Sequence, residues 1–213
     1  MIACLLAGAT LAACTTTTVD QQPMTAAALA APEPIGADRP APADVSNDSS
    51  AADFSLYALP ALWRNQLGDT LRLSMLSGRV RVVAMVYTDC HATCPLIVGD
   101  LKRIEAALLP HERDAVGFVL VSLDPLRDTP GRLTAWAAST ELDTARWTLL
   151  SGTDDAVREL AASLDVRYQR LQGGELAHTN GFAVLDRTGA IVHRQRGLGG
   201  TAETIRTIRR LLQ

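Results

Sequence analysis

Two cysteines stand four positions apart in the stretch Val86-Tyr87-Thr88-Asp89-Cys90-His91-Ala92-Thr93-Cys94-Pro95. The stretch follows an apolar, largely β-branched run from Val80 to Val86, which is typical of a buried strand. After it, apolar residues recur with the spacing of one helix face, namely Leu96, Ile97, Leu101, Ile104 and Leu108. The sequence therefore predicts a strand-to-helix turn that carries both sulfurs.

Both cysteines are predicted to lie in the first turn of that helix, where residues four positions apart face the same side. The sulfurs of Cys90 and Cys94 are then close enough to share a soft metal ion or to form a disulfide. Pro95 suits an early helical position, because its missing N–H would be unpaired there in any case. The partial positive charge of a helix N-terminus lowers thiol pKa values and favours thiolate, which both binds metal and attacks disulfides.

The length and composition of the chain favour a single folded domain. Its 213 residues, 47% of them hydrophobic, are enough for one good core once the unusual first quarter is set aside. The formal net charge is −3, and the later Lys and Arg residues are interspersed with acids. This composition provides no basic field for nucleic acid, so a nucleic-acid partner is not expected.

Residues 1–14 form a short apolar run that ends in Leu11-Ala12-Ala13-Cys14. The run is too short to span a bilayer as a helix, and it resembles the end of a bacterial lipoprotein signal peptide, although the usual basic segment ahead of it is missing. The resemblance implies export, lipidation of Cys14 and a lipid anchor on the periplasmic side of the cell membrane. Cys4 would then be removed, which leaves Cys90 and Cys94 as the thiols. The alternative is an apolar, Ala-rich tail without a targeting role.

Residues 15–52 are rich in Thr, Ala, Pro and Ser and contain no aromatic residue. Such a segment cannot bury enough apolar surface to offset its chain entropy, so a disordered linker is predicted. If Cys14 carries lipid, the linker is a tether that holds a folded domain clear of the membrane. Without lipidation it is a low-complexity tail.

From Asp53 the composition becomes that of a globular domain, residues 53–213. Short alternating runs around Gly68-Asp69 predict a β-hairpin. Later apolar runs predict strands at 117–123, 147–150, 182–186 and 190–193. Helices are predicted to begin near Asp128-Thr129-Pro130, near Thr153-Asp154 and before Ile205, and a polar break is predicted at 110–114.

Strands that alternate with helices indicate an α/β fold with a central mixed sheet. A reactive cysteine pair at the end of the first long strand is where a thioredoxin-like fold places its redox centre. We therefore expect a thioredoxin-like three-layer sandwich. The spacing here is Cys-x-x-x-Cys and not Cys-x-x-Cys, and the extra residue widens the pair into a chelate with room for a third ligand.

Three separated motifs carry a family resemblance. They are Thr88-Asp89-Cys90 with Cys94-Pro95, then Val121-Ser122-Leu123-Asp124-Pro125 with Asp128-Thr129-Pro130, and finally His178-Thr179 ahead of Phe182 to Gly189. In this order and spacing, the domain from about Asp53 to the C-terminus resembles the SCO/SenC family of copper-delivery proteins, which assist assembly of the copper centre of cytochrome c oxidase.

The resemblance implies that Cys90, Cys94 and His178 are copper ligands on a thioredoxin-like scaffold. Two thiolates select soft Cu(I), and an added imidazole gives a trigonal set that also tolerates Cu(II). The implied partner is the cytochrome c oxidase subunit that carries the copper centre. Other periplasmic copper chaperones and thiol reductases are further candidates.

Two positions depart from the family pattern. His91 follows the first cysteine where many members have proline, and Ala177 precedes the histidine where aspartate is frequent. A histidine at 91 adds a competing donor, although we interpret it as a solvated turn residue. Alanine at 177 removes a side chain that could orient the His178 imidazole.

Other chemistry-bearing residues have simpler interpretations. His111 and His193 are expected at the surface, and Asp124 and Asp128 are expected to stabilise a loop and cap a helix. The three tryptophans are expected in the core or at its rim, and they are Trp63, Trp136 and Trp147.

Three functions remain open from the residues. A metallochaperone, which is not an enzyme, needs all three ligands, whereas a thiol–disulfide oxidoreductase that keeps target cysteines reduced needs only Cys90 and Cys94 as its redox pair. A peroxidase would use Cys90 as the peroxidatic thiolate, but Thr88 alone does not establish the Thr and Arg group which that chemistry needs. No proline lies between Gly173 and Phe182, where thioredoxin-type reductases carry a cis-proline, and this disfavours the oxidoreductase. The metallochaperone is therefore the preferred hypothesis.

Overall fold

A computed structural model of the protein describes residues 54–213. The predicted signal peptide with its lipidation residue Cys14, and the predicted linker at 15–52, lie outside the described residues.

Nine strands and five α-helices are present in residues 54–213. The strands are β1 (Leu62–Asn65), β2 (Thr70–Arg72), β3 (Val80–Val86), β4 (Val116–Ser122), β5 (Trp147–Ser151), β6 (Tyr168–Arg170), β7 (Leu176–His178), β8 (Gly181–Leu185) and β9 (Ile191–Arg196). The helices are α1 (Cys94–Ala107), α2 (Pro110–Ala115), α3 (Pro130–Ser139), α4 (Asp154–Ser163) and α5 (Thr201–Leu212). Two short 3₁₀ helices complete the set, η2 (Leu56–Ala58) and η3 (Leu73–Leu76).

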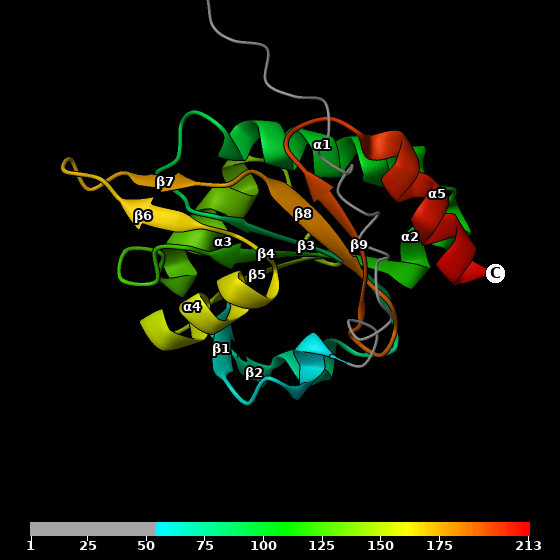
Figure 1. The fold of residues 1–213 in the computed structure, drawn as a ribbon, viewed down its shortest axis with the longest axis horizontal. Helices are drawn as coiled ribbons and strands as arrows, with labels where there is room; N and C mark the ends of the chain where they lie inside the picture. Colours follow the sequence, from blue (N-terminus) through cyan, green and yellow to red (C-terminus); the bar gives the residue numbers. More distant parts are fainter. Residues whose placement is uncertain (1–53) are drawn as a thin grey trace, which may run out of the picture. The chain divides into compact units, whose positions relative to one another are not determined.

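A seven-stranded mixed sheet in the order β2-β1-β5-β4-β3-β8-β9 forms the centre of this domain (Figure 1). Strand β3 lies parallel to β4 and antiparallel to β8, and β4 is parallel to β5. Six of the seven residues of β3 are buried, because helices and turns cover both faces of the sheet. The predicted run from Val80 to Val86 is therefore confirmed as a buried central strand.

Three layers result from the way the helices cover the sheet. Leu133 and Trp136 of α3 pack over Leu120 of β4, and α5 packs beside α1 on that face. On the other face, Leu160 of α4 packs with η2 and η3 over Val119. The expected three-layer α/β sandwich with a central mixed sheet is confirmed.

Local sequence signals are also reflected in the structure. Strands β1 and β2 form the predicted hairpin, and Gly68 in its turn has a φ of 91°, which favours glycine. Thr129 caps α3 by accepting a hydrogen bond from the backbone N–H of Arg132, and Thr153 caps α4 in the same way. Trp63 and Trp147 are fully buried, and Trp136 is partly buried.

Two elements differ from the prediction. The polar break at 110–114 is the short helix α2, in which the carboxylate of Glu112 accepts a hydrogen bond of 2.7 Å from the backbone N–H of Leu109. The strands β6 and β7 form a separate two-stranded sheet that the sequence did not predict. Each has only three residues, and Leu176 is the one fully buried side chain among them, so neither gives an alternating apolar pattern.

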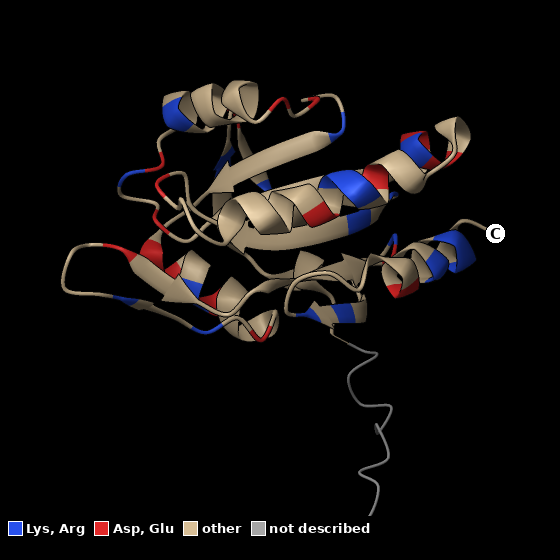
Figure 2. Cartoon of the chain, turned by 90° about the horizontal axis from the view of Figure 1, so that it is seen from above, with Lys and Arg blue, Asp and Glu red and all other residues tan. Residues whose placement is uncertain are grey.

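Acidic and basic side chains are mixed over the helices and loops of the domain (Figure 2). Among the described residues, no helix combines the length and apolar character needed to cross a bilayer.

Candidate metal centre

The two cysteines lie at the junction of β3 and α1. Helix α1 begins at Cys94, with Pro95 in its first turn, and Cys90 lies in the turn that precedes it. The prediction that both cysteines belong to the first helical turn is therefore wrong for Cys90. The turn still brings the thiols together, because the backbone N–H of Cys90 donates to the carbonyl of Tyr87 and folds the loop back. The backbone N–H of Cys94 then donates to the Cys90 sulfur at 3.3 Å.

A buried carboxylate fixes the start of this loop. Asp128, 1% exposed, accepts hydrogen bonds from the backbone N–H of Thr88 at 3.1 Å and from the Thr88 hydroxyl at 2.5 Å. The hydroxyl of Ser122 donates to the same carboxylate at 2.5 Å. Asp128 thus has a structural role, as expected, but it stabilises the cysteine loop, and Thr129 caps the helix instead.

His178 reaches the cysteines on the β6–β7 hairpin, where it is the last residue of β7. Tyr87, the residue that follows β3, holds this hairpin in place. Its hydroxyl donates to the carbonyl of Leu176 at 3.1 Å and accepts from the Leu176 N–H at 3.3 Å. The rings of Tyr87 and His178 meet edge to face with centroids 6.1 Å apart. Sequence analysis missed this positioning role, because no local pattern links residue 87 to residue 176.

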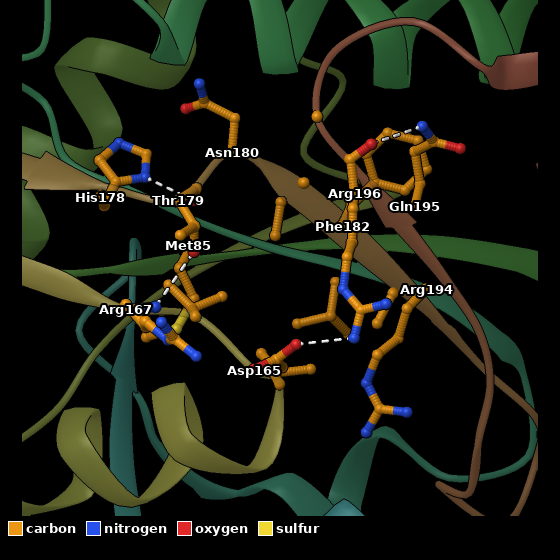
Figure 3. Close-up of a pocket in the computed structure, with 17 residues that line it drawn as sticks. Met85, Asp165, Arg167, His178, Thr179, Asn180, Phe182, Arg194, Gln195 and Arg196 are labelled. Carbon is orange, nitrogen blue, oxygen red and sulfur yellow. Dashed lines mark hydrogen bonds and ion pairs between the residues drawn. The ribbon is translucent and has the colours of Figure 1, made fainter. Parts of the chain in front are cut away.

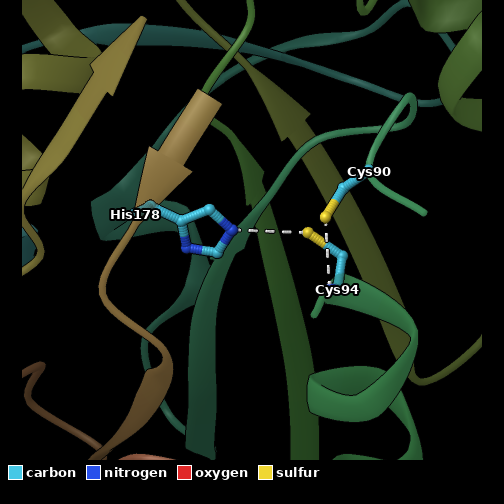
Figure 4. A group of neighbouring side chains, drawn as sticks. All are labelled: Cys90, Cys94 and His178. Carbon is cyan, nitrogen blue, oxygen red and sulfur yellow. Dashed lines mark hydrogen bonds between the residues drawn. The ribbon is translucent and has the colours of Figure 1, made fainter. Parts of the chain in front are cut away.

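The three predicted ligands converge in space (Figure 4). One donor atom from each of Cys90, Cys94 and His178 lies within 4.8 Å of the other two, and the Cys94 sulfur is 3.6 Å from Nε2 of His178. Metal–sulfur and metal–nitrogen bonds of about 2.0–2.3 Å place the ligands of a shared ion roughly 3.5–4 Å apart, which the observed spacing approaches. Both thiols are free. The donor set of two sulfurs and one imidazole therefore suits copper.

The imidazole of His178 is oriented by the backbone. Nδ1 lies 3.1 Å from the carbonyl oxygen of Thr179, and since a carbonyl only accepts, Nδ1 carries the hydrogen. Nε2 is then a free acceptor that faces the Cys94 sulfur. Ala177 is exposed and lies on the opposite side of β7. The Thr179 carbonyl therefore holds the ring, although no acidic side chain is present at 177.

The two thiols differ in acidity. Burial raises the pKa of Cys90, but hydrogen bonds from the Cys94 side chain and from the N–H groups of residues 92–94 outweigh burial and bring the pKa down to about 6. Burial, followed by the hydrogen bond to Cys90, raises the pKa of Cys94 above its ordinary value. At neutral pH Cys90 is the thiolate and Cys94 holds a proton.

A second set of contacts ties the hairpin to the loop that follows β4. The buried carboxylate of Asp124 pairs with Arg127 and, at 3.0 Å, with Arg170 of β6. Both guanidinium groups also donate to the carbonyl of Gly174 in the hairpin turn, Arg127 at 2.8 Å and Arg170 at 3.2 Å. Asp124 therefore stabilises the element that carries His178, a more specific role than the expected loop stabilisation.

The other three histidines, all within residues 54–213, are not part of this donor group. His91 and His111 are exposed, as expected, and His193 is half-buried, with Nε2 3.1 Å from the hydroxyl of Thr204. None of the three belongs to the group of donor atoms found among the described residues. His91 is thus consistent with its interpretation as a turn residue.

Residues 55–213 match the SCO1/SenC family model. The chain belongs to this family. The SCO1 protein homolog of Bacillus subtilis is 25% identical over 145 residues, which cover 67% of this chain and 75% of that relative. A SCO1/SenC family lipoprotein from Bacillus anthracis has a TM-score of 0.66 at 24% identity, covering 74% of this chain and 96% of that one. Copper-bound ScoI from Bradyrhizobium japonicum has a TM-score of 0.59 at 22% identity, covering 72% of this chain and 98% of that one.

These comparisons confirm the family resemblance and the thioredoxin-like fold that the sequence predicted. The Sco family includes copper-binding proteins and proteins that assemble cytochrome c oxidase. Cys90, Cys94 and His178 thus converge on a fold that this chain shares with copper-binding members of the family.

Proposed function

We propose that the protein is a copper metallochaperone, not an enzyme, that binds copper through Cys90, Cys94 and His178 and delivers it to the copper centre of cytochrome c oxidase. The observation that carries the proposal is the meeting of two sulfurs and one imidazole nitrogen within 4.8 Å, although His178 lies 84 positions from Cys94 in the sequence. Dithiol exchange alone has no need for the imidazole.

Each ligand has a distinct task toward the copper cargo. Cys90 presents a thiolate at neutral pH, because its pKa is about 6, and is the natural first point of attachment. Cys94 has a raised pKa and must lose its proton when copper binds, so binding releases a proton to the medium. His178 contributes Nε2, while the Thr179 carbonyl holds its other nitrogen. Two thiolates and one imidazole accept Cu(I) and also tolerate Cu(II).

A three-ligand site suits transfer, because a ligand from an acceptor can attack the copper before all the first ligands leave. The test is direct transfer. Copper-loaded, reduced protein is mixed with the isolated copper-centre domain of an oxidase subunit, and the copper content of each protein is measured after separation. Delivery predicts that copper moves to the acceptor faster than from a small-molecule chelate of equal affinity. An equal rate would contradict a delivery role.

The thiol–disulfide oxidoreductase remains a second candidate because one observation favours it. The pKa of Cys90 is lowered and the pKa of Cys94 is raised, which is the difference expected if Cys90 is the nucleophilic thiol and Cys94 the resolving thiol. The peroxidase alternative is weaker. Arg132 does donate to the Thr88 hydroxyl at 3.2 Å, but it is also paired with the Asp89 carboxylate, which offsets its charge.

We also propose that the protein is exported and anchored by lipid at Cys14, on the periplasmic side of the membrane. The Leu-Ala-Ala-Cys sequence and the naming of the Bacillus anthracis neighbour as a lipoprotein support this placement. Lipid burial contributes about 0.8 kcal/mol per CH₂, so loss of the acyl chains releases the protein. Cys14→Ser should move the protein from the membrane fraction to the soluble fraction. Membrane retention equal to that of the wild type would refute the anchor.

A further inference from the structure

A cavity of about 480 Å³ lies beside His178 (Figure 3). Its walls come from the loop between α4 and β6, from the segment around His178 and from the ends of β8 and β9. Its lining includes the core side chains Met85 and Phe182. This volume is within the range of ordinary ligand sites, roughly 300–1,000 Å³.

The charged side chains around the cavity are mainly basic. They are Arg167, Arg194 and Arg196, with Asp165 as the one carboxylate in the lining. Arg196 pairs with Asp165 at 2.8 Å, and Arg194 donates to the carbonyl of Ser163 at 3.2 Å. Within residues 54–213, the guanidinium of Arg167 makes no hydrogen bond or ion pair. The cavity is thus locally positive, whereas the whole chain has a net charge of −3.

The arginines are spread along the cavity instead of converging on one point. Arg194 and Arg196 lie two positions apart on β9, so they share one side of the strand. Arg167 lies on the opposite side of the cavity, next to Thr179 (Figure 3). A small anion is held best by donors that converge, whereas separated donors match an extended ligand with several carboxylates.

The cavity also adjoins the metal centre, because His178 belongs to both. Cys94 is fully buried and Cys90 is only 7% exposed, so His178 is the most accessible of the three donors. A protein that exchanges copper here must bring its own ligands to this point. Residues that flank those ligands will then lie over the adjoining cavity.

We propose that the cavity binds an extended, acidic segment of the protein that exchanges copper with this site. The inference rests on the proposed copper exchange for the identity of the partner. The apolar floor accepts side chains or backbone, and the arginines at its edge pair with carboxylates. Such pairs set orientation and association rate, and they weaken as salt rises.

The test uses a fluorescent peptide of alternating glutamate and glycine with the reduced full-length protein, and peptides with glutamine or lysine in place of glutamate as controls. We expect saturable binding of the glutamate peptide and none of the two control peptides. This binding should be weaker at ~0.15 M ionic strength than at low ionic strength. Glutarate at the same carboxylate concentration should not displace it. Displacement by glutarate would replace the peptide site with a small-anion site and overturn the proposal.

Arg167→Glu should weaken binding of the glutamate peptide about tenfold or more and create binding of the lysine peptide. Arg187→Glu is the matched control, because this exposed arginine lies in the β8–β9 turn, outside the cavity, and the change of charge is the same. Equal loss in the two variants would show non-specific attraction and refute the site. Arg167→Gln provides a milder variant that should give a smaller loss.

Copper binding is measured on the same samples by competition with a chelator. Arg167→Glu should bind copper like the wild type while losing the peptide. If the wild type binds the peptide but no copper, the proposed function fails and the peptide site stands. If copper binds and the glutamate peptide does not, the peptide site fails alone.

Discussion

The cysteine loop and the histidine hairpin make up the two sides of the metal centre, and they are built differently. The loop joins the buried strand β3 to α1 and is fixed by Asp128 beneath it. The hairpin β6–β7 lies outside the seven-stranded sheet and is held by Tyr87 and by the Asp124–arginine contacts. One side of the site therefore belongs to the core, and the other depends on a few hydrogen bonds.

This difference has a consequence for binding. Cys90 and Cys94 keep their relative positions whenever the domain is folded, whereas His178 is in place only when the hairpin is docked. Removing a hairpin contact should thus weaken copper binding without disturbing the thiols. Changes in the cysteine loop should alter both copper binding and the reactivity of the thiols.

Among the residues that hold the hairpin in place, the largest effect is expected for Tyr87→Phe. This change removes both hydrogen bonds to Leu176 and leaves its backbone groups without those partners. Copper affinity should fall roughly tenfold, the usual scale for losing a group that orients a ligand. Tyr57→Phe is the control, because the Tyr57 hydroxyl donates to Leu76, away from the site. Copper affinity measured by chelator competition should fall in Tyr87→Phe alone. An unchanged copper affinity in Tyr87→Phe would show that the hairpin does not depend on these hydrogen bonds.

On the loop side, the thiolate of Cys90 should form at unusually low pH. Because its pKa is about 6, the rate of alkylation of the copper-free protein should rise about tenfold from ~pH 5 to ~pH 7 and then level off. The alkylation rate rises with pH because only the thiolate reacts, and protonation below the pKa removes the thiolate. The midpoint should be nearly the same in Tyr57→Phe, because the Tyr57 hydroxyl bonds to Leu76, away from the cysteine loop. A midpoint near the ordinary thiol value would contradict the loop geometry.

The smallest effect is expected for Ala177→Asp. A carboxylate at 177 points away from the imidazole, whose Nδ1 is already bonded to the Thr179 carbonyl. Copper affinity should change by less than about twofold. A clear gain in affinity would mean that the aspartate reaches the ring and that the hairpin adapts to it.

The contrast between the two regions also explains what could be predicted from the sequence. The run Val80–Val86 and the helix start at Asp128-Thr129-Pro130 are local signals, and both are confirmed. The three-residue strands β6 and β7 give no periodic pattern, and the bonds of Tyr87 to Leu176 link positions 89 residues apart. His178 was identified only through family resemblance, since a lone histidine has no local signature.

The most direct test of the central claim compares copper binding and thiol chemistry in His178→Ala. The account predicts that copper affinity, measured by chelator competition, falls severely because one of three ligands is lost, while Cys90 and Cys94 still cycle between dithiol and disulfide in a thiol titration. Cys94→Ser is the reference and should lose both properties. If His178→Ala binds copper normally but has lost its thiol exchange, the imidazole is a proton-transfer group for redox chemistry, and the metallochaperone account is wrong.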